Sequence, residues 1–144
     1  MARTIKATPS TKMFGGNSVT PGTYFISDSI ITEETLQIAG EADTVYDSLQ
    51  VVLKHDQNGT QGAEVDATLQ LNGCWRPRRA ADGTRHQASG NFFDALLQAC
   101  QGKSFDQTRD YIKATFVGKR INIAYKEYPS QHGGFAKVPI VNLL

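Results

Sequence analysis

The sequence predicts a small, mainly β domain with one or two helices, built as a five-stranded barrel with a helix between its third and fourth strands. Three observations lead to this prediction. Short β-branched and aromatic segments recur between turn-forming residues, one amphipathic helical segment interrupts them, and 144 residues suffice for one hydrophobic core. We therefore expect a single folded domain over 22–144, preceded by a flexible arm over 1–21 that is rich in Thr, Ser, Gly, Pro and Lys.

The first three strands are predicted from alternation and turn chemistry. A β-branched and aromatic strand spans 23–31, and a loose acidic stretch follows over 32–46, with room for one short helical turn. Residues 48–54 then alternate between apolar and polar side chains. The segment 55–62 is dense in turn formers, and alternation resumes over 65–71. Two half-buried strands across an Asn-Gly loop predict an antiparallel hairpin.

A polar, arginine-rich loop over 73–90 separates this hairpin from a helix. Apolar residues at spacings of one, three and four predict the helix over 92–100, with Asn91 as its N-cap and Gly102 as its stop. A second short helix is expected over 106–114.

The chain then forms a final hairpin. Its strands cover 119–128 and 135–141, and the turn-rich residues between them form the tip. Five short strands cannot hide both faces of an open sheet, whereas a barrel removes the sheet edges and a helix can plug one end. The order of elements is that of an OB-fold, a Greek-key barrel; a small sandwich with one helix is the alternative.

The predicted core is one set of apolar side chains taken from all of these elements. Its members are Leu49, Val51, Leu53, Leu69, Leu71, Leu96, Leu97, Ile121, Ile123, Val138 and Ile140.

Several functional classes are disfavoured by composition. The chain has no run of about 18 apolar residues and no signal-like N-terminus, so we expect an intracellular protein with no membrane span. Cys74 and Cys100 are isolated, and the three histidines are scattered over turn-rich segments, so we expect no metal site and no cofactor. No nucleophile and base form a signature motif, which predicts that the protein is not an enzyme.

Charge is strongly asymmetric along the chain despite a net charge of +1. Residues 1–22 carry three bases and no acid, and residues 23–66 carry nine acids against the single base Lys54. Residues 67–144 carry eleven bases against five acids. If the fold gathers these bases on one face, the local field can attract phosphates. The alternative is that both signs interleave on a solvated surface.

Two segments combine aromatic and basic residues. An exposed Trp75 could stack on a base while the guanidinium groups of Arg76, Arg78 and Arg79 bind phosphates. Alternatively, Trp75 packs on the barrel and the arginines only solubilise a loop.

In the final hairpin, alternation places Tyr125 on the core face. Lys126, Tyr128, Phe135 and Lys137 are then the candidates for contact.

The chain resembles phage-type single-stranded DNA-binding proteins of the OB-fold class over roughly residues 21–144. The resemblance rests on Pro21-Gly-Thr-Tyr24 at the first strand, the helix residues Phe92-Phe-Asp-Ala-Leu-Leu97, and Gly118-Lys-Arg-Ile-Asn-Ile123 followed by Tyr125-Lys-Glu-Tyr128 and Gly134. Many such proteins end in an acidic tail that recruits replication partners, whereas this sequence ends in Ile140-Val-Asn-Leu-Leu144. Recruitment of partners by such a tail is therefore not expected.

The resemblance and the charge pattern together predict a protein that protects transient single strands during phage or mobile-element replication and recombination. Single-stranded DNA, or RNA, would lie in a basic groove with aromatic stacking. We also expect a homo-oligomer in the cytoplasm of an infected or host bacterium. The predicted contact residues are Trp75, Arg76, Arg78, Arg79, Arg85, Lys54, Lys119, Arg120, Lys126, Tyr128, Phe135 and Lys137.

The alternative function is that of a virion structural or assembly protein. In this case the N-terminal arm and the edge strands would form contacts between subunits.

Overall fold

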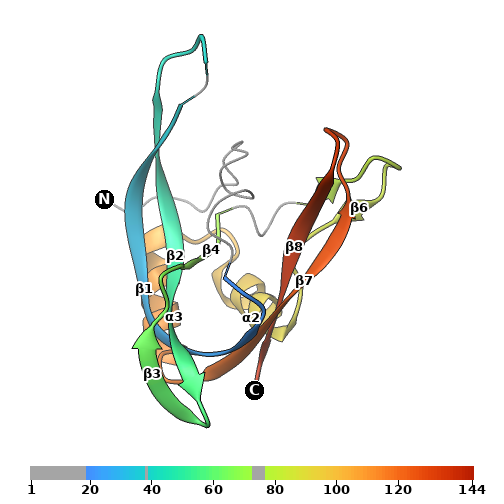
Figure 1. The fold of residues 1–144 in the computed structure, drawn as a ribbon. Coiled ribbons are helices and arrows are strands. Elements are labelled where there is room, and N and C mark those ends of the chain that lie inside the picture. The colour runs from blue at the N-terminus through green and yellow to red at the C-terminus, as the bar shows by residue number, and fades with distance from the viewer. Residues whose placement is uncertain (1–18, 38, 73–76) are drawn as a thin grey trace.

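The computed structural model describes residues 19–37, 39–72 and 77–144. Within these ranges the protein is mainly β with two helices, as the sequence predicts (Figure 1). The predicted arm lies almost wholly outside them. The strands are β1 (Gly22–Leu36), β2 (Thr44–Gln57), β3 (Thr60–Glu64), β4 (Leu69–Gln70), β5 (Arg78–Arg79), β6 (Arg85–His86), β7 (Arg120–Pro129) and β8 (Phe135–Leu143), and the helices are α2 (Asn91–Cys100) and α3 (Phe105–Thr115).

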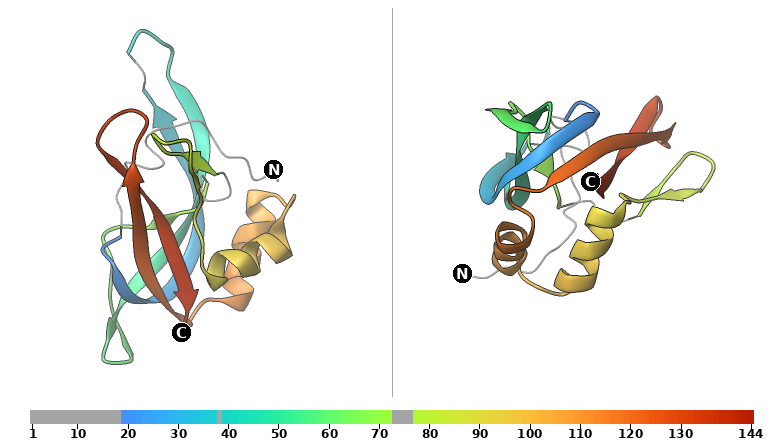
Figure 2. Two further views of the ribbon diagram at one scale, coloured as in Figure 1. Left: turned by 90° about the vertical axis from the view of Figure 1, so that its right-hand side faces the viewer. Right: turned by 90° about the horizontal axis from the view of Figure 1, so that it is seen from below.

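The main sheet is antiparallel and open. Its strands lie in the order β3-β2-β1-β7-β8, and β4 adds to β2. β3 and β8 are the ends of this order, and no ladder joins them in the described part of the chain, so the predicted closed barrel is not formed. β5 and β6 make a separate two-stranded hairpin. The two helices lie together on one side of the sheet (Figure 2).

The outer edge of β8 is occupied by the chain just before α2 rather than by β3. The Ser89 amide donates to the Pro139 carbonyl (3.1 Å), and the Val141 amide donates to the Ser89 carbonyl (2.9 Å). The Leu143 amide donates to Asn91 Oδ1 (2.6 Å), which continues the same edge. Because these backbone groups already have partners, they cannot pair with β3.

β1 and β2 are longer than the sequence suggests. The acidic stretch predicted to be loose is mostly strand, with Leu36 paired to Thr44 at the far end of the ladder. Polar side chains support this extension, because Gln50 Nε2 donates to Thr32 Oγ1 (2.9 Å) and the Tyr46 hydroxyl donates to Glu34 (3.1 Å). At the other end of β2 the predicted Asn-Gly turn is confirmed, although the strands run up to it and leave only two residues between them.

Both helices form where the apolar spacing predicts them, but their caps differ from expectation. Gly90 precedes α2, and the side chain of Asn91 makes no cap hydrogen bond. Asn91 instead joins α2 to β8. Its side-chain oxygen Oδ1 accepts a hydrogen bond from the Leu143 backbone amide, and its own backbone amide donates to Asn142 Oδ1 (2.9 Å). α3 begins with a capping box between Ser104 and Gln107.

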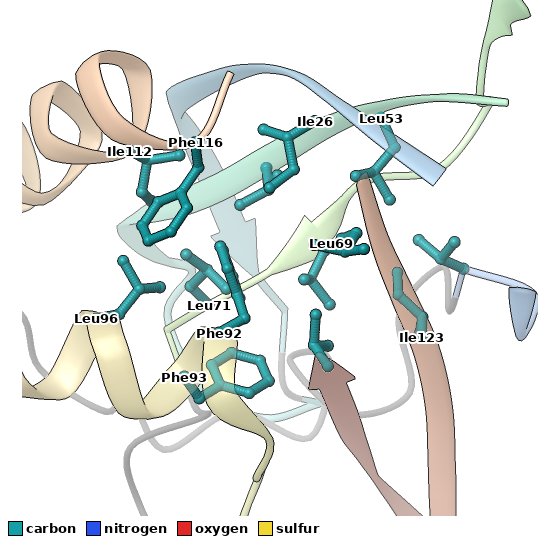
Figure 3. Close-up of a cluster of buried hydrophobic side chains, with 14 of the residues drawn as sticks. Ile26, Leu53, Leu69, Leu71, Phe92, Phe93, Leu96, Ile112, Phe116 and Ile123 are labelled. Atoms are coloured by element: carbon teal, nitrogen blue, oxygen red, sulfur yellow. The ribbon is translucent and has the colours of Figure 1, made fainter. Parts of the chain in front are cut away.

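The core fills the space between the sheet and the helices (Figure 3). Phe92, Leu96 and Ile112 from the helices are fully buried in one cluster with residues that include Ile26 of β1 and Leu71, which follows β4. Most of the predicted core is confirmed. The exceptions are Leu97 and Ile140, which are half-buried, and Val138, which belongs to a second, smaller cluster.

Candidate nucleic-acid interface

The fold divides the predicted contact residues into two groups. Lys54, Lys119 and Arg120 lie where β7 begins, whereas the remaining described candidates lie toward the far end of β7 and on the hairpins next to it. The ten residues of β7 separate its two ends by about 30 Å, at about 3.3 Å per residue. No local sequence pattern indicates this separation, which places the described candidates at two ends of one strand.

The first group packs around Phe25 in the middle of the sheet. Lys54 on β2 and Arg120 on β7 are both cross-strand neighbours of Phe25. The Arg120 guanidinium lies 5.9 Å from the Phe25 ring centroid, and its Nη2 forms an ion pair with Asp56 Oδ2 (2.8 Å). The Asp56 side chain is only 7% exposed. Arg120 therefore already has an anionic partner within the protein, which the sequence did not indicate when it suggested a phosphate contact. Lys119 beside it is exposed.

The second group includes the β5–β6 hairpin, which the sequence treats as part of a polar loop. The Ala80 amide donates to the Thr84 carbonyl (2.7 Å), and Gly83 turns the chain with φ of 86°. The Thr84 amide also donates to Asp82 Oδ1 (2.9 Å), and this hydrogen bond lowers the pKa of Asp82. Asp-Gly between two short runs is a hairpin signal, so this element could have been predicted.

Arg79 and Arg85 face each other across this hairpin. They are direct cross-strand partners, and both are exposed. Because the adjacent Ala80–Thr84 pair carries the hydrogen bond, Arg79 and Arg85 form a pair of the non-hydrogen-bonded type, whose Cα atoms lie about 4.5 Å apart and whose side chains are closest. Neither arginine has an ion pair among the described residues.

Tyr128 is buried, so the prediction that it offers an exposed ring is wrong. It is 5% exposed and forms the second hydrophobic cluster with Ala80 and Val138. The His86 ring stacks on it with centroids 4.2 Å apart and planes inclined by 18°. Burial raises the pKa of Tyr128, and the nearby Arg78 guanidinium opposes this change. Alternation along β7 correctly separates Tyr128 from the main core but cannot show that another hairpin covers it.

The opposite face of the β7–β8 hairpin carries an exposed aromatic ring and a cation. Phe135 is 77% exposed, and Lys137 is two residues further along the same face. Lys137 Nζ lies 4.5 Å from the centroid of the Tyr125 ring, whose hydroxyl donates to the Val19 carbonyl (2.7 Å). Tyr125 is half-buried against the main core, as predicted for that residue. Lys126 lies on the Tyr128 face and is exposed.

Two surfaces of opposite charge result from this arrangement. The double hairpin, defined as residues 77–86 and 125–137, carries five Lys or Arg residues and two acids, a formal sum of +3. The acidic arm, defined as residues 29–37 and 39–53 of β1, β2 and their connection, carries five acids and no Lys or Arg. Figure 1 shows the arm and the β7–β8 hairpin diverging from the core. Part of the charge asymmetry along the chain is therefore also a separation in space, although five described bases of 67–144 lie outside the double hairpin.

Some predictions fall on residues that the structure does not describe. Trp75, Arg76 and Cys74 lie outside the described residues, so the stacking role of Trp75 stays a prediction. In the part that is described, no group of three or more His, Cys, Asp or Glu side chains could hold a metal ion. Cys100 is buried, and this burial raises the pKa of its thiol. None of the described helices is long and apolar enough to cross a membrane.

Comparisons with protein-family models, with curated proteins and with solved structures found no match to this chain.

Proposed function

We propose that this protein binds single-stranded nucleic acid through the double hairpin. The observation that carries the proposal is the exposed Arg79–Arg85 pair. Like charges directly opposite each other on a hairpin are destabilising, and a two-stranded ribbon has little other stability to offset them. A phosphate between the two guanidinium groups reverses the sign of this interaction, since each arginine can donate two hydrogen bonds to phosphate oxygens.

The exposed ring of Phe135 supports a single strand as the ligand. Unpaired bases can stack on an aromatic side chain irrespective of sequence, and Lys137 on the same face supplies a cation for the backbone. Phe135 and the arginine pair lie on opposite sides of the double hairpin, because β5–β6 covers the Tyr128 face of β7–β8. A flexible single strand can pass round the hairpin and reach both sides. Duplex DNA, with a persistence length of about 50 nm, cannot.

The strand connections also support the proposal. The order β3-β2-β1-β7-β8, with helices between β4 and β7, matches the connections expected of an OB-fold in which β3 and β8 have not joined. We infer an opened relative of that barrel, with a role in protecting single strands during phage or mobile-element replication and recombination. The exposed Lys126 adds a cation to the double hairpin, and Trp75 and Arg76 stay predicted contacts outside the described residues.

The test replaces Arg79 and Arg85 together by glutamine. Binding of a fluorescently labelled dT oligonucleotide is measured by anisotropy at several salt concentrations. Each lost phosphate contact lowers the slope of log K against log salt by about 0.7, so the double variant, which loses the one phosphate that the pair shares, should lose about 0.7. The control is Lys103→Gln with Arg109→Gln, which removes the same amount of positive charge. Lys103 is exposed just before α3, and Arg109 forms ion pairs with Asp106 and Asp110 on α3.

An unchanged slope in the Arg79 and Arg85 variant, or an equal loss in the control, would exclude the arginine pair from the interface. Tighter binding of a duplex than of the dT strand would contradict the choice of single strands.

The separated charges favour one second candidate, a virion assembly protein that is a homo-oligomer. The acidic arm of one copy and the double hairpin of the next are complementary in charge, and each carries an exposed apolar side chain, Val45 at 57% and Phe135 at 77%. Salt-sensitive self-association in sedimentation, with no binding of oligonucleotide at low salt, would favour this function over the first.

A further inference from the structure

The β5–β6 hairpin is held to the protein by a hydrophobic cluster that is separate from the main core. Tyr128, Ala80 and Val138 form this cluster, with Ala136 packed against it. None of these side chains belongs to the main cluster between the sheet and the helices. A hairpin with only two paired residues on each strand is not stable alone, so its position depends on this small cluster.

Two further contacts of the hairpin converge on the same end of β7. The His86 ring stacks on Tyr128 at 4.2 Å between centroids. The Ala81 amide donates to the Pro129 carbonyl (3.0 Å), immediately beyond Tyr128. β7 therefore contacts β5–β6 through the Tyr128 ring and through the Pro129 carbonyl.

This packing determines which side chains of β5–β6 face outward. Arg78 is the cross-strand partner of His86, so both lie on the face of the hairpin that packs against Tyr128. Arg79 and Arg85 are the next pair and lie on the opposite face, where both are exposed. The contact with Tyr128 thus presents the arginine pair to solvent.

We propose that Tyr128 is a positioning residue for the nucleic-acid site, with His86 as its partner. Its ring holds β5–β6 in a docked state in which Arg79 and Arg85 are presented as a pair, and it does not contact the strand itself. The proposal rests on the proposed function. When β5–β6 is undocked, a strand binds without the arginine pair, so both the affinity and the number of neutralised phosphates fall.

The test compares Tyr128→Ala with the conservative variant Tyr128→Phe, which keeps the stacking ring. Hydrogen exchange of the backbone amides is measured without ligand. The Ala81 amide, which donates to the Pro129 carbonyl, reports docking of β5–β6 on β7, and the Ala80 amide, which donates to the Thr84 carbonyl, reports the hairpin itself. Binding of the labelled dT oligonucleotide is measured at several salt concentrations. Tyr128→Ala should speed exchange at Ala80 and Ala81, leave α2 protected, and lose the same slope of about 0.7 as the double arginine variant. Tyr128→Phe should restore both properties.

Two results would overturn the proposal. Unchanged exchange at Ala80 and Ala81 in Tyr128→Ala would show that the ring does not hold the hairpin. Fast exchange with an unaltered slope would show that docking does not position the arginines, while the arginine pair could still bind phosphate.

A wild-type protein that does not bind the oligonucleotide would instead overturn the proposed function, and the positioning role with it. If Tyr128→Ala exposes the whole core to exchange, His86→Ala replaces it, because this variant removes the stacking partner from the hairpin side only.

Discussion

Gly90 combines a backbone conformation and a close approach that together require glycine. Its φ is 108°, in the region that side chains disfavour. A Cβ atom at this position would lie 2.1 Å from the Val141 carbonyl oxygen, which belongs to the backbone of β8 and cannot rotate away. Gly90 therefore allows the N-terminus of α2 to pack directly on the edge strand.

Replacing Gly90 by alanine should lower the free energy of unfolding by at least about 2 kcal/mol, since the strained φ and the clash with β8 add. Gly102→Ala is the matched control, because Gly102 also has positive φ (78°) but no atom within 4 Å of the added Cβ. It should cost about 1 kcal/mol from conformation alone. Urea unfolding measures both, and equal losses would show that the contact with Val141 does not matter.

At the scale of elements, periodicity predicted both helices and the strands β1, β2, β7 and β8, because each carries an apolar face against the core. The strand predicted over 65–71 is wrong except for β4 at Leu69–Gln70, and β3 lies instead at Thr60–Glu64, largely within the segment predicted as a turn. Periodicity failed where tertiary contacts override local preference. Glu and Asp are poor strand formers, so the extended ends of β1 and β2 looked like a loop. Polar contacts such as that between Gln50 Nε2 and Glu34 Oε1 (3.2 Å), which join residues far apart in sequence, accompany this pairing. The burial of Tyr128 depends on a distant hairpin.

Arg120 connects two elements, since its side chain leaves β7 and meets Asp56 at the end of β2. Arg120→Gln should cost about 1 to 3 kcal/mol of stability, because it leaves a largely buried carboxylate without its charged partner. The salt slope of oligonucleotide binding should not change.

The neighbouring variant Lys119→Gln is the control for Arg120→Gln. Lys119 is exposed and has no ion pair among the described residues, so Lys119→Gln should change the free energy of unfolding by less than about 0.5 kcal/mol. If Arg120→Gln lowers the salt slope of oligonucleotide binding and leaves the stability unaltered, Arg120 contacts phosphate and belongs to the interface.

At the scale of the whole molecule, the acidic arm creates a field that opposes the approach of a polyanion to the double hairpin. Glu41 and Asp43 are exposed on this arm. Neutralising them as Glu41→Gln with Asp43→Asn should speed association with the dT oligonucleotide, by up to about tenfold at low salt. The gain should vanish near 1 M salt, where the Debye length is about 3 Å.

Stopped-flow anisotropy measures this rate. The exposed pair Asp66→Asn with Asp94→Asn changes the net charge equally from outside the arm and should produce a smaller gain. Equal gains in the two variants would mean that only net charge matters.

The central position of β1 has a consequence for the folding pathway. Its pairing with β2 closes at Leu36 and Thr44, eight positions apart, whereas its pairing with β7 joins Gly22 to Ile123. Closing the longer loop costs about 2 kcal/mol more in chain entropy. The β1–β2 ribbon can therefore form early and by itself, while the apolar face that it shares with β7 and the helices stays open until the distant strand arrives. During that interval this face is the part of the chain most exposed to aggregation, and the acidic side chains at the end of the ribbon provide the repulsion that opposes it.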